Sequence, residues 1–289
     1  MPSLIDLRRR IKSVKNTRQI TKAMKMMSAA RLRRAQERVL AARPYASLMR
    51  QFLGRLVASL EASGTLDPEQ PLHPLLARRP VERVLLLVMG GDKGLAGAFN
   101  ANVFKSAASF LEEYNGKHID LIPIGRKPRD FFRRRRALTA EFSDIFAKVK
   151  YEDARSITAQ IIQRYTAGEC DEVHVIYNEF KSVLVQRLRT ERLLPLDTPK
   201  GEAPIDYIFE QPPAELLATL LPRYVEVQVF RALLESSASE HASRMTAMDA
   251  ASKNASEMID RLTLNMNRIR QASITREIIE IVSGAAALE

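Results

Sequence analysis

Two long segments, one near each end of the chain, lack the residues that normally interrupt helices. No proline occurs from residue 3 to residue 43, no glycine precedes Gly54, and residues 214–282 contain only one such residue, Pro222. Because an α-helix rises 1.5 Å per residue, about 50 residues of continuous helix extend over roughly 75 Å. A small globular domain cannot bury both ends of such a helix, so we expect each segment to pair with another helix.

Apolar side chains recur along both segments with alternating steps of three and four residues, a spacing typical of left-handed coiled coils. The N-terminal stripe is Leu4, Leu7, Ile11, Val14, Thr17, Ile20, Met24 and Met27, with one extra step of three, a stammer; the C-terminal stripe is Met245, Met248, Ser252, Ala255, Ile259, Leu262, Met266 and Ile269. The two segments flank an intervening domain, so we predict an antiparallel pair. Periodicity alone leaves open a C-terminal helix that only packs on a globular core.

The middle of the chain has a different pattern. Short apolar runs at 84–89, 119–124 and 173–177 alternate with helical stretches at 101–114 and 153–168, the second of which ends at Gly168. This alternation predicts an α/β domain with a largely parallel sheet. Residues 183–196 alternate in polarity, and we expect them to extend the sheet at an edge.

The charge of the chain is strongly basic and unevenly placed. The net charge is +11, and residues 1–60 contain fifteen Lys or Arg against two acids, Asp6 and Glu37. Such a segment favours an acidic partner, which charge alone does not identify. A basic coiled-coil protein that binds nucleic acid is therefore an alternative function. Against it, residues 1–44 contain no aromatic side chain for stacking on bases, and the basic residues are spread around the helix.

No catalytic or metal-binding set can be assembled from the sequence. The turn "GGDKGLAGAFN" (90–100) follows an apolar run, but Lys93 precedes Gly94 and no hydroxyl residue follows, so it lacks the order of a phosphate-binding loop. The four histidines are scattered without ligand spacing, and the single cysteine, Cys170, excludes an internal disulfide. We therefore expect no catalytic site, no bound nucleotide, no metal and no cofactor. No apolar run reaches the ~20 residues that span a bilayer, so we expect no direct insertion into a membrane.

Long stretches of the sequence resemble the ATP synthase gamma subunit family. They are "NTRQITKAMKMMSAARLRRAQ" (16–36), "LLPRYVEVQVFRALLESSASEHASRMTAMDAASKNA" (220–255) and "RLTLNMNRIRQASITREIIEIVSGAAAL" (261–288), together with the glycine turn and "VIYNEFKSVLVQ" (175–186). The resemblance implies a Rossmann-like α/β domain (76–211) inserted into a long antiparallel left-handed coiled coil of an N-terminal helix (1–60) and a C-terminal helix (213–289). A cysteine-bearing insertion of the chloroplast type is absent, which favours a bacterial type.

The resemblance also implies a function. A chain of this family would be the central rotary shaft of a proton-translocating F-type ATP synthase, coupling rotation of the membrane ring to conformational change at the catalytic sites of the beta subunits. The implied partners are the alpha and beta subunits, the epsilon subunit and the c ring. The implied location is peripheral, at the cytoplasmic face of the bacterial inner membrane.

Two groups of residues match family positions that contact the beta subunits. Arg270, Gln271, Thr275 and Glu277 lie in "RQASITRE", and Lys22, Met24 and Lys25 lie in "ITKAMKM". The resemblance implies that the first group holds a rotational dwell and that the second faces an acidic loop of the beta subunits. The apolar "IIEIVSGAAALE" at the end of the chain would fit an apolar sleeve.

Overall fold

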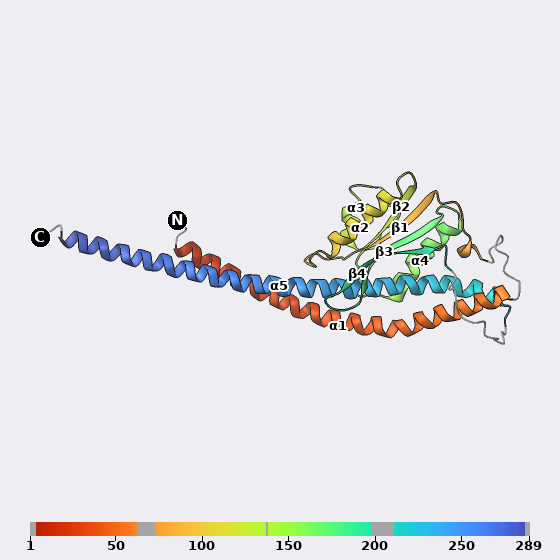
Figure 1. Ribbon diagram of the computed structural model, residues 1–289, viewed down its shortest axis with the longest axis horizontal. Helices are drawn as coiled ribbons and strands as arrows, with labels where there is room; N and C mark the ends of the chain where they lie inside the picture. Colours follow the sequence, from red (N-terminus) through yellow and green to blue (C-terminus); the bar gives the residue numbers. More distant parts are fainter. Residues whose placement is uncertain (1–3, 63–72, 137, 198–210, 287–289) are drawn as a thin grey trace. The chain divides into compact units, whose positions relative to one another are not determined.

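The computed structural model describes residues 4–62, 73–136, 138–197 and 211–286 (Figure 1). Each end of the described chain forms one long helix, as the sequence predicts. Helix α1 spans Leu4–Ala62 and helix α5 spans Pro213–Ala286, with Pro44 and Pro222 inside them. Both helices therefore continue through a proline, at the cost of one backbone hydrogen bond each.

The chain divides into two compact units. One contains residues 1–29 and 244–289, and the other contains residues 30–243. The second half of α1 and the first part of α5 thus belong to the unit that holds the α/β domain. The boundaries 1–60, 76–211 and 213–289 that we expect from the sequence follow the long helices rather than these units.

A four-stranded mixed sheet forms the centre of the α/β domain. Its strands are β1 (Arg83–Met89), β2 (His118–Ile124), β3 (Glu172–Phe180) and β4 (Gln186–Leu194), in the order β2-β1-β3-β4. Strand β1 is parallel to both β2 and β3, whereas β4 is antiparallel to β3 at the edge. These findings confirm the predicted parallel strands and the predicted edge extension.

Among the described residues, three helices and a short 3-10 turn complete the domain. They are α2 (Phe99–Glu113), α3 (Arg126–Phe132), α4 (Tyr151–Thr166) and the turn Pro74–Leu76. Gly168, just beyond α4, has φ +71°, a left-handed conformation that ends helices and favours glycine. This confirms the predicted stop. The sequence pattern does not reveal α3, because it is only seven residues long and carries Pro128 in its first turn.

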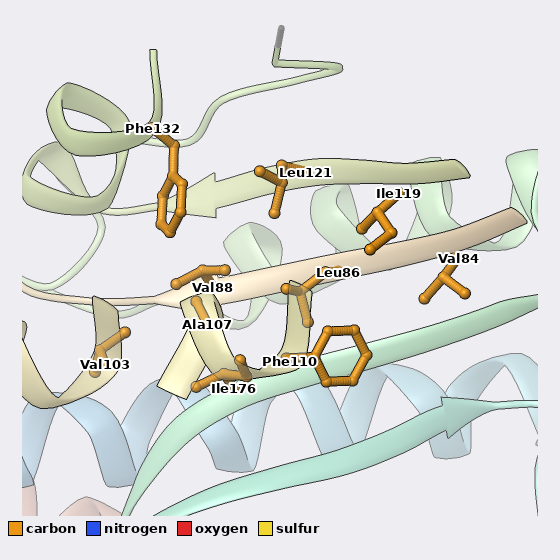
Figure 2. Packing of buried hydrophobic residues seen from close by; sticks show 10 residues of the cluster. All are labelled: Val84, Leu86, Val88, Val103, Ala107, Phe110, Ile119, Leu121, Phe132 and Ile176. Carbon is orange, nitrogen blue, oxygen red and sulfur yellow. The ribbon is translucent and has the colours of Figure 1, made fainter. Parts of the chain in front are cut away.

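Both faces of the central strands are buried. Figure 2 shows Val84, Leu86 and Val88 of β1 packed against α2 and neighbouring residues. The alternate residues Leu85 and Leu87 are also fully buried. A parallel sheet covered on both faces reads as a continuous apolar run, which is why "VLLLVM" shows no alternation.

The outer edge of β2 is covered by the chain itself. The N–H of Thr139 donates to the carbonyl of Leu121 (3.2 Å), and the N–H of Phe142 donates to that of Pro123 (3.2 Å). Phe142 also forms an isolated parallel bridge with Ile124. These bonds satisfy backbone groups that an open edge would leave unpaired.

Candidate functional site on the two long helices

The buried stripe of α1 follows an uninterrupted heptad spacing. Its most buried members in the first unit are Leu7, Ile11, Thr21 and Ser28, with partly buried residues at 4, 14, 18 and 25. This register has no stammer, so the prediction of one is wrong. Ile20 and Met27 are 59% and 55% exposed, and Thr17 is exposed as well.

The physical reason for this error is that polar side chains occupy the seam of α1 after Val14. An apolar search selects Ile20 and Met27, whereas the helix turns Thr21 and Ser28 toward its partner. In α5 the predicted stripe is confirmed: Met248, Ala255 and Ile259 are buried and the other predicted members are partly buried. Apolar periodicity therefore identified one seam fully and the other only at its start.

Polar contacts join α1 and α5 within the part of the first unit that the structure describes. The Lys25 ammonium lies 2.6 Å from Asp249 Oδ1, and the hydroxyls of Thr21 and Ser252 are 2.7 Å apart. Arg18 Nη1 donates to Ser256 Oγ at 3.4 Å. We call these three contacts the polar ladder. Because ascending positions on α1 meet descending positions on α5, the ladder shows that the pair is antiparallel.

The acidic member of the ladder is held by two lysines. Hydrogen bonds from Lys25 and Lys253 lower the pKa of Asp249 below its ordinary value. Lys253 lies one helical turn beyond Asp249 on α5, at 3.4 Å. Asp249 is therefore ionised at neutral pH and keeps Lys25 directed toward α5.

The helical register leaves the last part of α5 without α1 beside it. Extending the register of the polar ladder places Leu4, the first residue of α1, opposite Ile269. Beyond that point α5 continues to Ala286, past the start of α1 (Figure 1). Arg270, Gln271, Thr275 and Glu277 all lie on this single-helix segment and are exposed.

The exposed polar residues of this segment make only local contacts with described residues. Thr275 Oγ1 donates to the backbone carbonyl of Gln271 (3.0 Å), and Ser273 Oγ donates to Glu277 Oε1 (3.3 Å). Gln271 and Thr275 share one face of the helix, being four residues apart. Their amide and hydroxyl oxygen are thus accessible to another chain.

Large apolar side chains are also exposed on the single-helix segment. Ile274, Ile278 and Ile279 are 49%, 55% and 58% exposed, and Ile281 and Val282 are also exposed. A soluble helix surface rarely carries such a continuous apolar group unless a partner covers it. The end of α5 therefore has the character of an interface.

The two predicted groups of contact residues lie far apart. Lys22 is exposed, Met24 is partly buried, and Lys25 is paired with Asp249. At 1.5 Å per residue, the distance along α5 from Asp249 to Arg270 is about 30 Å. The structure therefore brings the members of each group together but does not bring the two groups together.

The glycine turn is filled by side chains of the chain itself. Asp92 accepts hydrogen bonds from the backbone N–H groups of Arg126, Asp144 and Phe146, each at 3.0 Å. A side chain at Gly91 would contact the carboxyl carbon of Glu240, in α5, at 2.9 Å. In a doubly wound fold, a ligand phosphate binds at this end of the sheet, against a helix N-terminus. Here a protein carboxylate already accepts from the first N–H of α3.

A polar stretch of α5 is buried, which the apolar pattern of the sequence does not predict. Residues 232–242 are all buried, and Ser236 and Ser239 bracket Asn178 of β3. The N–H of Asn178 donates to Ser236 Oγ (3.2 Å), and Ser239 Oγ donates to the Asn178 carbonyl (3.1 Å). Burial raises the pKa of Glu235 in the same stretch, although the charges of Arg231 and Arg43 act against the rise. The signal was the run of small side chains in "ESSASEHAS", which allows close packing on every side.

The described residues offer no metal site and no membrane span. No group of three or more His, Cys, Asp or Glu side chains among them is placed to hold a metal ion. None of the described helices combines the length and the apolar character needed to cross a bilayer. Cys170 is buried, and its burial raises the pKa of its thiol to about 11.

Comparisons with known proteins point to one family. The family model described as ATP synthase matches residues 3–288. The chain is 58% identical to the ATP synthase gamma chain of Solibacter usitatus and 50% identical to that of Pelotomaculum thermopropionicum, over the whole length of both chains.

Solved structures resemble the chain as well. It matches a chain of the central stalk and c ring of the Tetrahymena thermophila mitochondrial ATP synthase with a TM-score of 0.62 and 26% identity, covering 81% of this chain and 99% of that one. A chain of the Euglena gracilis mitochondrial ATP synthase shares the fold, with a TM-score of 0.66 and 17% identity, covering 99% of this chain and 94% of that one.

Proposed function

The chain belongs to the ATP synthase gamma chain family, and we propose that two zones on its long helices carry its contacts with the catalytic subunits. The gamma chain is the rotary shaft of that enzyme and couples rotation of the membrane ring to conformational change at the catalytic sites. The comparisons support this role and do not support the alternative of a basic coiled-coil protein that binds nucleic acid.

The partners follow from the same assignment. They are the alpha and beta subunits, the epsilon subunit and the c ring, and the Tetrahymena relative is described as part of a central stalk with its c ring. The chain is thus a peripheral part of a membrane complex. Since two of its most similar relatives are bacterial, we place it at the cytoplasmic face of a bacterial inner membrane.

The first proposed zone is the single-helix segment of α5 that contains Arg270, Gln271, Thr275 and Glu277. One observation supports it above all: this segment exposes polar and large apolar side chains together, with no described helix beside it. A shaft that touched three equivalent subunits equally would shift none of their equilibria, because only differential contacts change populations. Polar groups on separate faces of one helix allow such a segment to hold one subunit at a time.

The second proposed zone is the exposed face of α1 near Lys22. Lys22 is exposed and forms no ion pair with any residue that the structure describes, whereas the charge of Lys25 is shared with Asp249. We therefore assign to Lys22 the contact with an acidic loop, and to Lys25 a mainly interhelical role. Met24 is partly buried and belongs to the same proposed zone.

A double substitution tests the first zone. Gln271→Leu with Thr275→Val removes two neutral hydrogen-bonding groups, a loss of about 1 to 3 kcal/mol in the bound state. We expect ATP synthesis and hydrolysis by a reconstituted complex to fall at least about fivefold, while the circular dichroism of the chain stays unchanged.

The matched control for this test is Asn254→Leu with Asn265→Leu, two exposed polar-to-apolar changes on the paired part of α5. It should leave turnover near the wild-type rate. Normal turnover of the Gln271→Leu, Thr275→Val complex would remove the functional assignment of the segment.

We further propose that catalysis resides in the other chains of the complex. Support comes from the glycine turn, where the Asp92 carboxylate already accepts hydrogen bonds from three backbone N–H groups, among them the first of α3. We expect calorimetry to detect no ATP binding to the full-length isolated chain at micromolar concentrations. Binding that disappears on Lys93→Ala would contradict this proposal.

A further inference from the structure

A dense group of basic side chains lies on the α/β domain. It consists of Arg126, Lys127 and Arg129 in α3 and the run Arg133–Arg136 that follows it; within these eleven residues the one acid is Asp130. We call this group the arginine patch. It lies next to β2, the edge strand whose outer side residues 139–142 cover.

Only part of the patch is neutralised by the protein. Arg126 pairs with Asp144, and Arg129 pairs with Asp130 at 2.9 Å. The side chains of Arg133, Arg134 and Arg136 are exposed and form no hydrogen bond or ion pair with any described residue. Like charges so close together repel one another, and an anionic partner would relieve this repulsion.

The remaining arginine of the run, Arg135, is held in place. Arg135 Nη1 donates to the Phe131 carbonyl at 2.8 Å, and its guanidinium carbon lies 3.9 Å from the centre of the Phe131 ring. Phe131 is in turn stacked on Phe104, with 4.2 Å between ring centres. A guanidinium fixed on an aromatic ring loses less side-chain entropy when it binds, so Arg135 is preorganised for a partner.

The surroundings of the patch argue against nucleic acid and against a membrane. Two groups about 4 Å from one ring centre cannot share one face, so Phe104 and Arg135 cover both faces of Phe131 and leave no platform for a base. Phe132 is buried, and residues 126–136 include no exposed large apolar side chain. Stable binding to a membrane generally needs such an apolar contribution in addition to charge.

We propose that the arginine patch is a docking surface for a carboxylate-rich segment of another protein chain. Carboxylates match the forked geometry of arginine and form paired hydrogen bonds with it, which a lysine cannot do. Four adjacent arginines, three of them unpaired among the described residues, present several such forks at once. The segment would bind through its acidic side chains and need no apolar pocket.

The test uses the full-length chain and a fluorescent decapeptide of glutamate, followed by fluorescence anisotropy at physiological salt. The patch variant changes Arg133, Arg134, Arg135 and Arg136 to Gln. The control variant changes Arg8, Arg9, Arg10 and Lys12, which are exposed on α1, to Gln and loses the same charge. A second patch variant, Arg134→Gln with Arg136→Gln, leaves the Arg135 contact with Phe131 intact in case the first variant folds poorly.

We expect the four-residue patch variant to weaken peptide binding at least about tenfold and the control variant to weaken it by less than about threefold. The affinity of the two-residue variant for the peptide should lie between the affinities of the patch and control variants. Equal weakening by the patch and control variants would overturn the proposal, because the peptide would then report net charge alone. The proposal would also be overturned if the wild-type chain did not bind the peptide. Binding that depends on the patch but occurs only with phosphatidylglycerol vesicles or with a uridine decamer would overturn it as well.

Discussion

At the scale of single residues, carboxylates that accept backbone hydrogen bonds organise the α/β domain. Asp171 accepts hydrogen bonds from the backbone N–H groups of Glu82 (3.1 Å) and Arg83 (2.8 Å), and from the Arg83 guanidinium (3.3 Å). Burial alone would raise the pKa of this carboxyl, but the bonds from Arg83 and Glu82 and the charge of Arg83 outweigh burial and lower it. Asp171 thus joins the start of β1 to the start of β3, much as Asp92 joins the ends of β1 and β2.

The sign of the resulting pH dependence follows from the lowered pKa. A carboxyl whose pKa is lower in the folded state stabilises the fold above its unfolded pKa of about 3.9, and this stabilisation is lost as the pH falls through the folded value. We expect Asp171→Asn to lower the free energy of unfolding by about 1 to 3 kcal/mol at pH 7, because the amide keeps one acceptor and loses the charge.

Urea unfolding followed by circular dichroism between pH 7 and pH 3 measures this effect. The difference in free energy of unfolding between wild type and Asp171→Asn should become smaller as the pH falls below about 4. Asp260→Asn, at an exposed position of α5, is the control and should change stability by less than about 0.5 kcal/mol. If this difference in free energy of unfolding did not change with pH, Asp171 would act through its shape and not through its charge.

At the scale of the elements, the polar ladder determines how α1 and α5 pair in the first unit. Apolar seams permit several registers, whereas polar or charged seam residues favour the one register in which they meet. We expect Lys25→Glu to disturb the register by opposing Asp249, and the combination of Lys25→Glu with Asp249→Lys to restore it.

Disulfide formation between Thr21→Cys and Ser252→Cys reports this register, since the two hydroxyls are 2.7 Å apart. The disulfide should form more slowly in the Lys25→Glu background and at the original rate in the charge-swapped chain. Lys12→Glu, an exposed change on the same helix, should have no effect. If Lys25→Glu leaves the rate unchanged, the ion pair does not determine the register.

The elements also show how far a sequence of this kind can be read. Glycine and proline placement predicted both long helices. Three apolar runs predicted β1, β2 and β3, and the alternating polarity of residues 183–196 predicted β4, because these signals act locally. The seam of α1 was missed after Val14 because its members there are Arg18, Thr21, Lys25 and Ser28, which resemble surface residues until the partner helix is known. The buried polar stretch 232–242 was missed for the same reason: its hydrogen bonds to Asn178 depend on tertiary contacts.

At the scale of the whole molecule, the assigned role requires the chain to turn as one body against subunits that it contacts unequally. A shaft of two supercoiled helices resists twisting better than one helix, and exposed charges suit contacts that must form and release, because salt screens them over about 8 to 10 Å. The family resemblance identified this role from the sequence. The individual contact residues are proposed on the ground of their exposure, which makes them accessible to a partner subunit.

The central claim, that this chain is the moving shaft of a rotary ATP synthase, is tested most directly by watching it turn. The complex would be assembled with its alpha and beta subunits fixed to a surface and a bead attached to a cysteine introduced at exposed Glu112, Cys170 being buried. We predict that ATP drives continuous rotation of the bead in one direction, and that a disulfide linking the chain to a beta subunit stops both rotation and ATP hydrolysis until it is reduced. ATP hydrolysis that continues at the full rate while the cross-linked chain stays still would contradict the claim.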